Sequence, residues 1–209
     1  MSARTVLCYG DSNTHGWRPD GGGRWPLEVR WTGVLAAELR PGWRVLEEGL
    51  NSRTTVHDDP LTPHRNGRTY LAPCLASHAP LDAVAIFLGM NDLKARFAVG
   101  ASDIAAGVGA LAELVLASGS GPAGGAPRVL LLGLPRLGRI DGRWDESFAG
   151  AAEKAARLPA QLEAIASELG VGFLDLSTVA CSDLDGVHLD EAAHRTIGES
   201  LARSLAAVF

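Results

Sequence analysis

The sequence predicts an α/β fold, a three-layer α/β/α sandwich built around a five-stranded parallel sheet. Short apolar segments, which suit strands buried on both faces, alternate with longer segments whose apolar residues recur at helical spacing. The alternation occurs five times, and strands that alternate with helices form parallel sheets with helices on both faces. Because 209 residues, of which 46% are hydrophobic, can bury one sizeable core, we expect a single domain over residues 1–209.

The strands are expected where apolar runs are bounded by glycine or by other turn residues. These segments are 6–9, 43–49, 82–88, 128–134 and 171–176. The run 82–88 is the clearest candidate for the centre of the sheet, because it is apolar almost throughout. Glu47 and Glu48 are unusual in a buried element, so we expect the second strand at an edge.

The helices are expected where apolar residues recur every three or four positions. These segments are 30–39, 69–78, 102–118, 148–169 and a last helix that begins at Asp190. Pro41 and Gly42 end the first helix, and Pro159 is expected to kink or split the fourth. Trp31 opens the first helix, where packing in the core is the expected role.

Charge and composition exclude several classes of function. The net charge of -5 and the absence of any lysine or arginine run argue against nucleic-acid and membrane partners, which select basic patches. The chain enters its first strand within a few residues of Met1 and has no apolar run of membrane-spanning length, so we expect a cytoplasmic protein. Cys8, Cys74 and Cys181 lie far apart without a C-x-x-C spacing, so we expect neither disulfides nor a zinc site.

The first strand runs directly into Gly10-Asp11-Ser12-Asn13, which is a candidate nucleophile turn. Open α/β sheets bind ligands at the carboxyl ends of their strands, where the N–H groups of the following helix are unpaired. Ser12 is therefore expected to be exposed and close to amide donors. Taken alone, the stretch is equally well explained as a turn that caps a helix.

Two further polar motifs follow strands of the same sheet. Asp185 precedes His188 by three residues on a loop after the fifth strand, and such a pair can activate a serine if the carboxylate orients the imidazole. Asp183 and Asp190 are competing partners for this histidine. Asn91 follows the third strand and can donate to an oxygen that becomes negative, although an Asn-Asp turn is the simpler interpretation. Because all three motifs follow parallel strands, we expect them on one edge of the sheet.

Together these motifs resemble the SGNH, or GDSL, hydrolases. The matching blocks are Gly10-Asp11-Ser12, Gly89-Met90-Asn91-Asp92 and Asp185-Gly186-Val187-His188. Segments 30–35, 47–50, 53–55 and 59–60 are most similar to the arylesterase/acyltransferase branch. The resemblance implies a flavodoxin-like fold and a serine esterase that transfers an acyl group from a small-molecule ester to water or an alcohol. It also implies a homo-oligomer that needs no cofactor and no metal.

The resemblance assigns roles to individual residues. The implied triad is Ser12, Asp185 and His188, the implied oxyanion donors are Ser12, Ser52 and Asn91, and we expect Asp11, Trp17 and Asn51 in the substrate pocket. Ser52 occupies a position where the family usually has a glycine. The backbone N–H of Ser52 can still donate to the oxyanion, but its side chain is expected to narrow the pocket.

Other interpretations remain open at this stage. The same machinery suits a deacetylase of carbohydrate or other O-acetyl esters, and the fold also suits a ligand-binding module without catalysis. A nucleotide-binding domain is disfavoured, because the first loop has no G-x-G-x-x-G or P-loop sequence. Trp17, Trp25 and Trp144 lie in loops at the carboxyl edge, where they suit an apolar pocket and a subunit interface equally.

Overall fold

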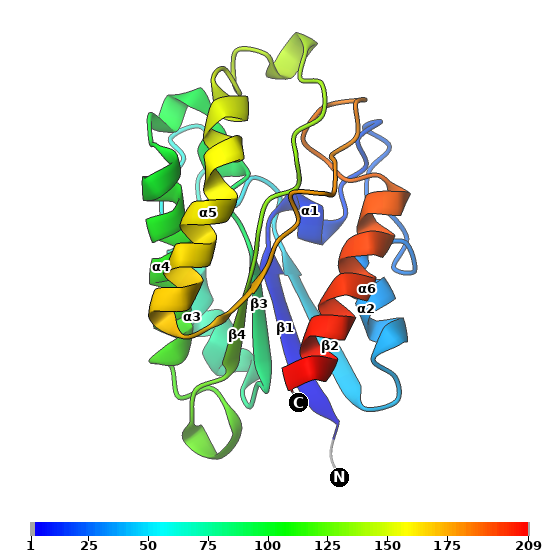
Figure 1. Ribbon diagram of the computed structural model, residues 1–209, viewed down its shortest axis with the longest axis vertical. Coiled ribbons are helices and arrows are strands. Elements are labelled where there is room, and N and C mark those ends of the chain that lie inside the picture. The colour runs from blue at the N-terminus through cyan, green and yellow to red at the C-terminus, as the bar shows by residue number, and fades with distance from the viewer. Residues whose placement is uncertain (1–2, 209) are drawn as a thin grey trace.

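The computed structural model describes residues 3–208, and its centre is one parallel sheet (Figure 1). The strands are β1 (Arg4–Gly10), β2 (Trp43–Gly49), β3 (Ala83–Phe87), β4 (Arg128–Leu132) and β5 (Gly172–Leu174), in the order β2-β1-β3-β4-β5. All five residues of β3 are buried, and β3 occupies the middle of the sheet as predicted. β2 is an edge strand, which confirms the prediction from its two glutamates.

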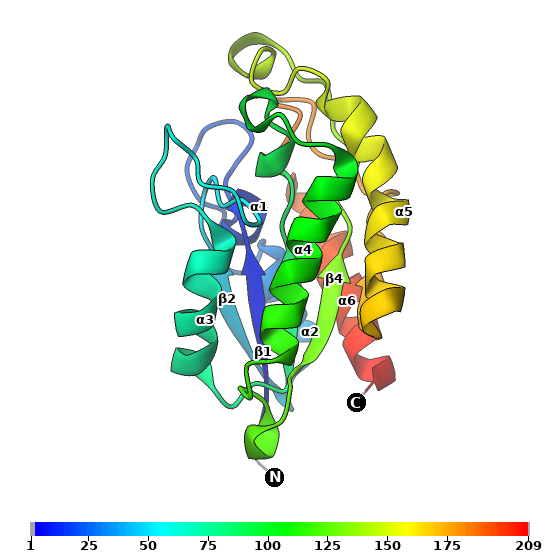
Figure 2. The same ribbon diagram turned by 90° about the vertical axis from the view of Figure 1, so that its left-hand side faces the viewer.

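Helices cover both faces of this sheet. They are α1 (Ser12–His15), α2 (Trp31–Glu38), α3 (Gly67–His78), α4 (Ala101–Leu116), α5 (Ala151–Leu169) and α6 (Glu191–Val208). Helices α2 and α6 lie on one face, and α3, α4 and α5 lie on the other (Figures 1 and 2). This arrangement confirms the predicted three-layer α/β fold. Among the described residues, no helix combines the length and the apolar character needed to cross a bilayer.

The bounds of most elements differ from the prediction by a few residues, and two differences have a physical explanation. The fifth strand ends at Leu174 rather than at residue 176, because the Asp175 carboxylate accepts bonds from the backbone and hydroxyl of Ser177 and starts a turn. Helix α5 is not split at Pro159. Proline removes only one backbone hydrogen bond, and the apolar face of α5 buries Leu158 and Leu162 on either side of it.

A buried histidine joins the two helices of one face. The Nδ1 atom of His194 in α6 accepts a hydrogen bond from the backbone N–H of Trp31, the first residue of α2, at 3.2 Å. The Trp31 ring lies in the core, as predicted, with its centroid 6.1 Å from that of Phe87. His194 is fully buried, and burial lowers its pKa to about 3. The histidine is therefore neutral in the folded protein and caps α2 as an acceptor.

This capping predicts acid sensitivity. An unfolded histidine takes up a proton near pH 6.5, whereas folded His194 does so only near pH 3, so the unfolded state binds more protons in between. The stability that His194 contributes is present above pH 6.5 and is lost as the pH falls toward 3, by up to about 1.4 kcal/mol per pH unit. In His194→Asn, Oδ1 replaces Nδ1 as the acceptor. The free energy of unfolding, measured with urea at several pH values, should fall less steeply with decreasing pH in this variant than in the wild type. Equal slopes in the two proteins would contradict the assignment.

Candidate active site

The turn after β1 holds Ser12 at the end of the strand. β1 ends at Gly10 and α1 begins at Ser12, and the Asp11 carboxylate caps α1 by accepting from the backbone N–H of Asn13 at 2.9 Å. A Cβ atom on Gly10 would lie 2.1 Å from the Thr14 hydroxyl oxygen, so only glycine lets α1 fold back this closely over the strand. The stretch is therefore both a turn that caps a helix and the segment that positions Ser12, so the two interpretations do not exclude each other.

Ser12 lies in the wall of a cavity of about 220 Å³. The sequence predicted an exposed serine, but the structure buries it. Only 7% of its surface is exposed, because loops that follow the other strands rise around it. Figure 1 shows these loops above the carboxyl ends of the strands, at the end opposite both termini. The cavity brings together six of the residues to which the family resemblance assigned roles: Ser12, Trp17, Asn51, Ser52, Asn91 and His188.

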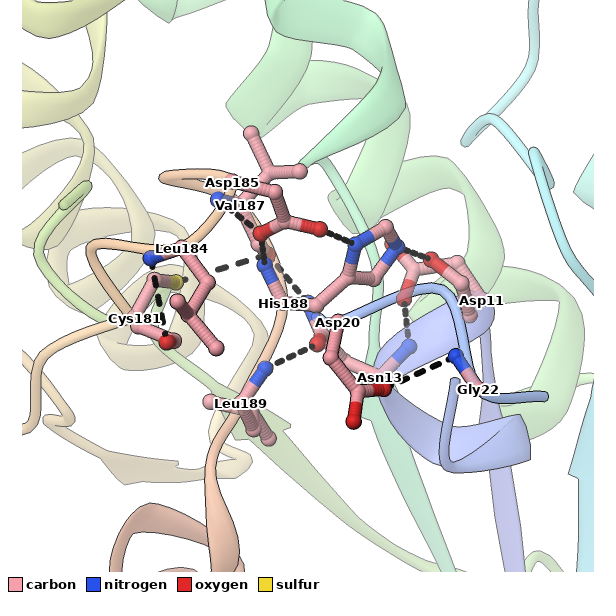
Figure 3. A network of polar contacts seen from close by, with 12 residues as sticks. Asp11, Asn13, Asp20, Gly22, Cys181, Leu184, Asp185, Val187, His188 and Leu189 are labelled. Atoms are coloured by element: carbon pink, nitrogen blue, oxygen red, sulfur yellow. Dashed lines mark hydrogen bonds and ion pairs between the residues drawn. The ribbon is translucent and has the colours of Figure 1, made fainter. Parts of the chain in front are cut away.

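A chain of hydrogen bonds connects Ser12, His188 and Asp185. The Nε2 atom of His188 lies 3.0 Å from the Ser12 hydroxyl oxygen. The Nδ1 atom of the same ring lies 2.6 Å from Oδ2 of Asp185 (Figure 3). The two competing carboxylates have other partners. Asp183 accepts from the backbone of Arg139, and Asp190 caps α6. Asp185 is therefore the carboxylate that orients this imidazole.

The surroundings of Asp185 keep it ionised. Burial by itself would raise the pKa of this carboxyl group, but the hydrogen bond and charge of His188 and two backbone N–H groups hold the pKa below its usual value. An ionised Asp185 holds the proton of His188 on Nδ1, which leaves the Nε2 lone pair facing Ser12. The distance of 3.0 Å is within reach for transfer of the serine proton to a general base.

Asn13 holds the loop of His188 against α1, a role that sequence reasoning missed. Its Nδ2 donates to the carbonyl of Val187 at 3.1 Å, and its Oδ1 accepts from the backbone N–H of Leu189 at 3.1 Å (Figure 3). These two bonds flank His188 on both sides. The residue was visible only as part of a turn, because no sequence pattern indicates a contact between segments some 175 positions apart.

Asn91 lies at the start of a short 3-10 helix (Asn91–Leu93) with its amide against the cavity. Nδ2 donates to the Arg53 carbonyl at 3.0 Å and to Oδ2 of Asp11 at 3.3 Å. Asp11, which we expected in the substrate pocket, is buried and does not line the cavity, because capping α1 and bonding to Asn91 engage its carboxylate. Burial raises the pKa of Asp11 to about 6.

This geometry is accompanied by a match to a known family. Residues 8–196 match the GDSL-like lipase/acylhydrolase family. The chain belongs to this family. The native aryl esterase of M. smegmatis is 42% identical with a TM-score of 0.93, and the alignment covers 99% of this chain and 100% of that one. Est24, a carbohydrate acetylesterase from Sinorhizobium meliloti, is 40% identical with the same TM-score and coverage. A comparison with curated proteins finds no match.

The loop between β2 and α3 explains the unusual serine of this GDSL-like protein. Ser52 has a φ of +66°, a left-handed conformation that glycine adopts most easily. Arg53 holds the loop in place: its guanidinium donates to the carbonyls of Gly10 and Glu48, and it lies 4.1 Å from the centroid of the Tyr9 ring. Sequence reasoning included Arg53 only in the resemblance. A buried arginine that joins the ends of β1 and β2 has no signature of its own.

The tryptophans separate into two groups. Trp17 and Trp144 line the cavity, together with Met90, Phe148 and Val187. The Trp17 ring lies 6.5 Å from that of His188. Trp25 does not reach the cavity, because its Nε1 donates to the Leu189 carbonyl and the Arg18 guanidinium covers its ring. Trp25 was expected either to line an apolar pocket or to contact another subunit. It does not line this cavity, and the subunit contact stays a prediction.

One group of possible metal ligands exists among the described residues. Ligand atoms of Glu48, Cys74 and His78 lie within 4.8 Å of one another, but none of these residues lines the cavity at Ser12. His78 Nε2 lies 2.8 Å from Oε1 of Glu48, so these two side chains already pair. Burial, together with the charge of Glu48, raises the pKa of the Cys74 thiol to about 12. The thiol is thus protonated at neutral pH, and the hydrogen-bonded triad remains the best candidate for chemistry.

Proposed function

We propose that the protein hydrolyses small carboxylic esters through an acyl-enzyme on Ser12. The hydrogen-bonded chain from Asp185 through His188 to Ser12, in the wall of a cavity, carries this proposal. His188 Nε2 takes the serine proton while Oγ attacks the ester carbon, and it then gives the proton to the departing alcohol oxygen. Water, activated by the same imidazole, breaks the new ester bond and frees the acid and Ser12.

The negative oxygen of the intermediate needs donors, and three groups suit this role. The backbone N–H groups of Ser12 and Ser52 have no acceptor among residues 3–208, and both residues line the cavity. The third donor is Nδ2 of Asn91, whose bond to Asp11 at 3.3 Å is the longer of its two. Donors that are already in position cost no reorganisation when the charge develops.

The size and walls of the cavity favour small esters with an apolar body. An engineered cavity of about 150 Å³ accommodates benzene, so about 220 Å³ has room for an aromatic ring with a short acyl group. The similarity to the M. smegmatis aryl esterase agrees with this choice. Deacetylation of carbohydrates is the second candidate, favoured by the similarity to Est24, and a substrate panel separates the two. The intact hydrogen-bonded triad disfavours a silent ligand-binding module.

Removing the nucleophile tests the central step. Ser12→Ala should abolish turnover of 4-nitrophenyl acetate and leave the circular dichroism spectrum unchanged, because only a hydroxyl group is lost. Asp185→Asn should lower kcat by about 10⁴, since the amide favours the wrong tautomer of His188. Asp183→Asn is the matched control and should keep its activity, because Asp183 bonds to the Arg139 backbone. Retained turnover in Ser12→Ala would refute the mechanism.

Two substitutions distinguish the side-chain donor of Asn91 from the backbone donor of Ser52. Asn91→Ala should lower kcat about 10²–10³-fold with little change in KM, because the side-chain donor acts on the transition state. Ser52→Gly should stay within a few-fold of the wild type, since its donor is the backbone N–H and glycine adopts the φ of +66° without strain. Steady-state kinetics on one ester decide the matter. Equal losses in both variants would contradict this division of roles.

We further propose that an alcohol competes with water for the acyl-enzyme. Trp17, Trp144 and Phe148 line the cavity with apolar surface, which favours a bound apolar alcohol over water. With vinyl acetate and a few per cent benzyl alcohol in buffer, the ratio of benzyl acetate to acetic acid should exceed the molar ratio of alcohol to water. Trp17→Ala should lower the ratio, and Trp25→Ala, outside the cavity, should not. A wild-type product ratio at or below the molar ratio would indicate a plain esterase.

A further inference from the structure

Lys94 places an unpaired positive charge in the wall of the catalytic cavity. The residue directly follows the short helix that begins at Asn91, and both residues line the cavity. Only 5% of its surface is exposed. Within residues 3–208 its ammonium group has no hydrogen-bond partner and no carboxylate within ion-pair distance. The Nζ atom of Lys94 lies 5.9 Å from the centroid of the Phe148 ring, which allows a cation–π contact.

The carboxylates that act on Lys94 from farther away are all engaged elsewhere. Their partners are Arg96 for Asp59, Thr55 for Asp92, and the Asn13 backbone and Asn91 for Asp11. Burial, and to a smaller extent the charge of Arg96, lowers the pKa of Lys94 to about 8. The three carboxylates oppose this shift without forming a pair. A lysine in such surroundings still carries its charge at neutral pH, but it lacks a counter-ion.

Packing of the aliphatic stem does not explain this position. A lysine that only covers apolar surface directs its ammonium group to bulk water. Lys154, the other lysine of the chain, satisfies its ammonium group by donating to the Leu93 carbonyl at 2.8 Å. Lys94 instead lines a cavity whose other described residues are partly apolar and partly polar but include no carboxylate. An ion held in such a place is stabilised when a ligand brings the opposite charge.

We propose that Lys94 binds a carboxylate carried by the ester itself, which makes the enzyme selective for anionic esters. This inference rests on the proposed esterase function of the same cavity. The apolar side chains of the cavity, among them Met90, Trp144 and Phe148, receive the hydrocarbon part of the substrate. The favoured substrates are therefore amphiphilic, with an aromatic or alkyl body and one negative end. The carboxylate belongs either to the acyl part or to the alcohol part, and the experiment has an arm for each.

The test compares each anionic ester with its neutral methyl ester. The pair 4-acetoxybenzoate and methyl 4-acetoxybenzoate places the charge on the alcohol part. The pair mono(4-nitrophenyl) glutarate and its methyl ester places the charge on the acyl part. For each pair, the selectivity is the ratio of kcat/KM for the anionic ester to that for the neutral ester. General effects of a substitution on catalysis cancel in this ratio.

Lys94→Met should lower the selectivity at least tenfold in one arm or both, mainly through a higher KM for the anionic ester. Lys94→Arg keeps the charge and should retain most of the selectivity. Lys154→Met is the matched control, because it removes a lysine that lies outside the cavity, and its selectivity should equal that of the wild type. The arm that responds identifies the part of the substrate that carries the carboxylate. No change in either arm overturns the inference.

The two proposals fail in different ways. If the wild type turns over none of the four esters, the esterase proposal fails, and Lys94 is then tested by binding alone. Benzoate should then quench the tryptophan fluorescence of the wild type at a concentration at least tenfold lower than it requires in Lys94→Met. Equal binding would overturn the inference. If Lys94→Met does not fold, as thermal unfolding would show, Lys94→Gln takes its place in the same measurements.

Discussion

The hydrogen bonds of Asn13 are the constraint on which the site depends. They join α1, near the beginning of the chain, to the loop before α6, near its end, and they flank His188 on both sides. Ser12 precedes Asn13 by one residue, so the same contact sets the distance between the proposed nucleophile and the proposed base. Displacement of a reacting group by about 1 Å can cost about 10²-fold in rate. The contact between α1 and the loop before α6 therefore stabilises the fold and also positions the proposed catalytic residues.

The carboxylates near this edge show how surroundings separate similar groups. Asp185 receives bonds from His188 and from the backbone, which lower its pKa despite burial. Burial dominates at Asp11 and at Asp92, whose pKa values are raised. Asp185 can thus act as the permanent anion of the triad, while Asp11 and Asp92 serve as hydrogen-bond acceptors for Asn91 and Thr55. One residue type performs two tasks because its partners differ.

The hydrogen-bonded triad lies at the carboxyl edge of the sheet, and the walls of the cavity are the part that we propose selects the substrate. An aryl esterase and a carbohydrate acetylesterase are similar to this chain at the same TM-score of 0.93, so the backbone alone does not set the substrate. Here the walls combine aromatic rings with Lys94, a single cation that lacks a counter-ion among residues 3–208. A cavity that holds one cation without a counter-ion favours an anionic ligand, because the unpaired ion is costly until a ligand pairs with it.

The order of strands and helices, the edge position of β2 and the three polar motifs could all be predicted from the sequence. These features depend on local periodicity and on turn residues, which neighbouring positions encode. The tertiary structure decided that Ser12 is buried in a cavity, that the buried Asp11 does not line it and that Trp144 rather than Trp25 does. It also decided that Asn13 and Arg53 hold the loops in place. Such contacts join segments that are distant in the chain, and which segments meet depends on how all the loops pack together, so no pattern within one segment can specify them.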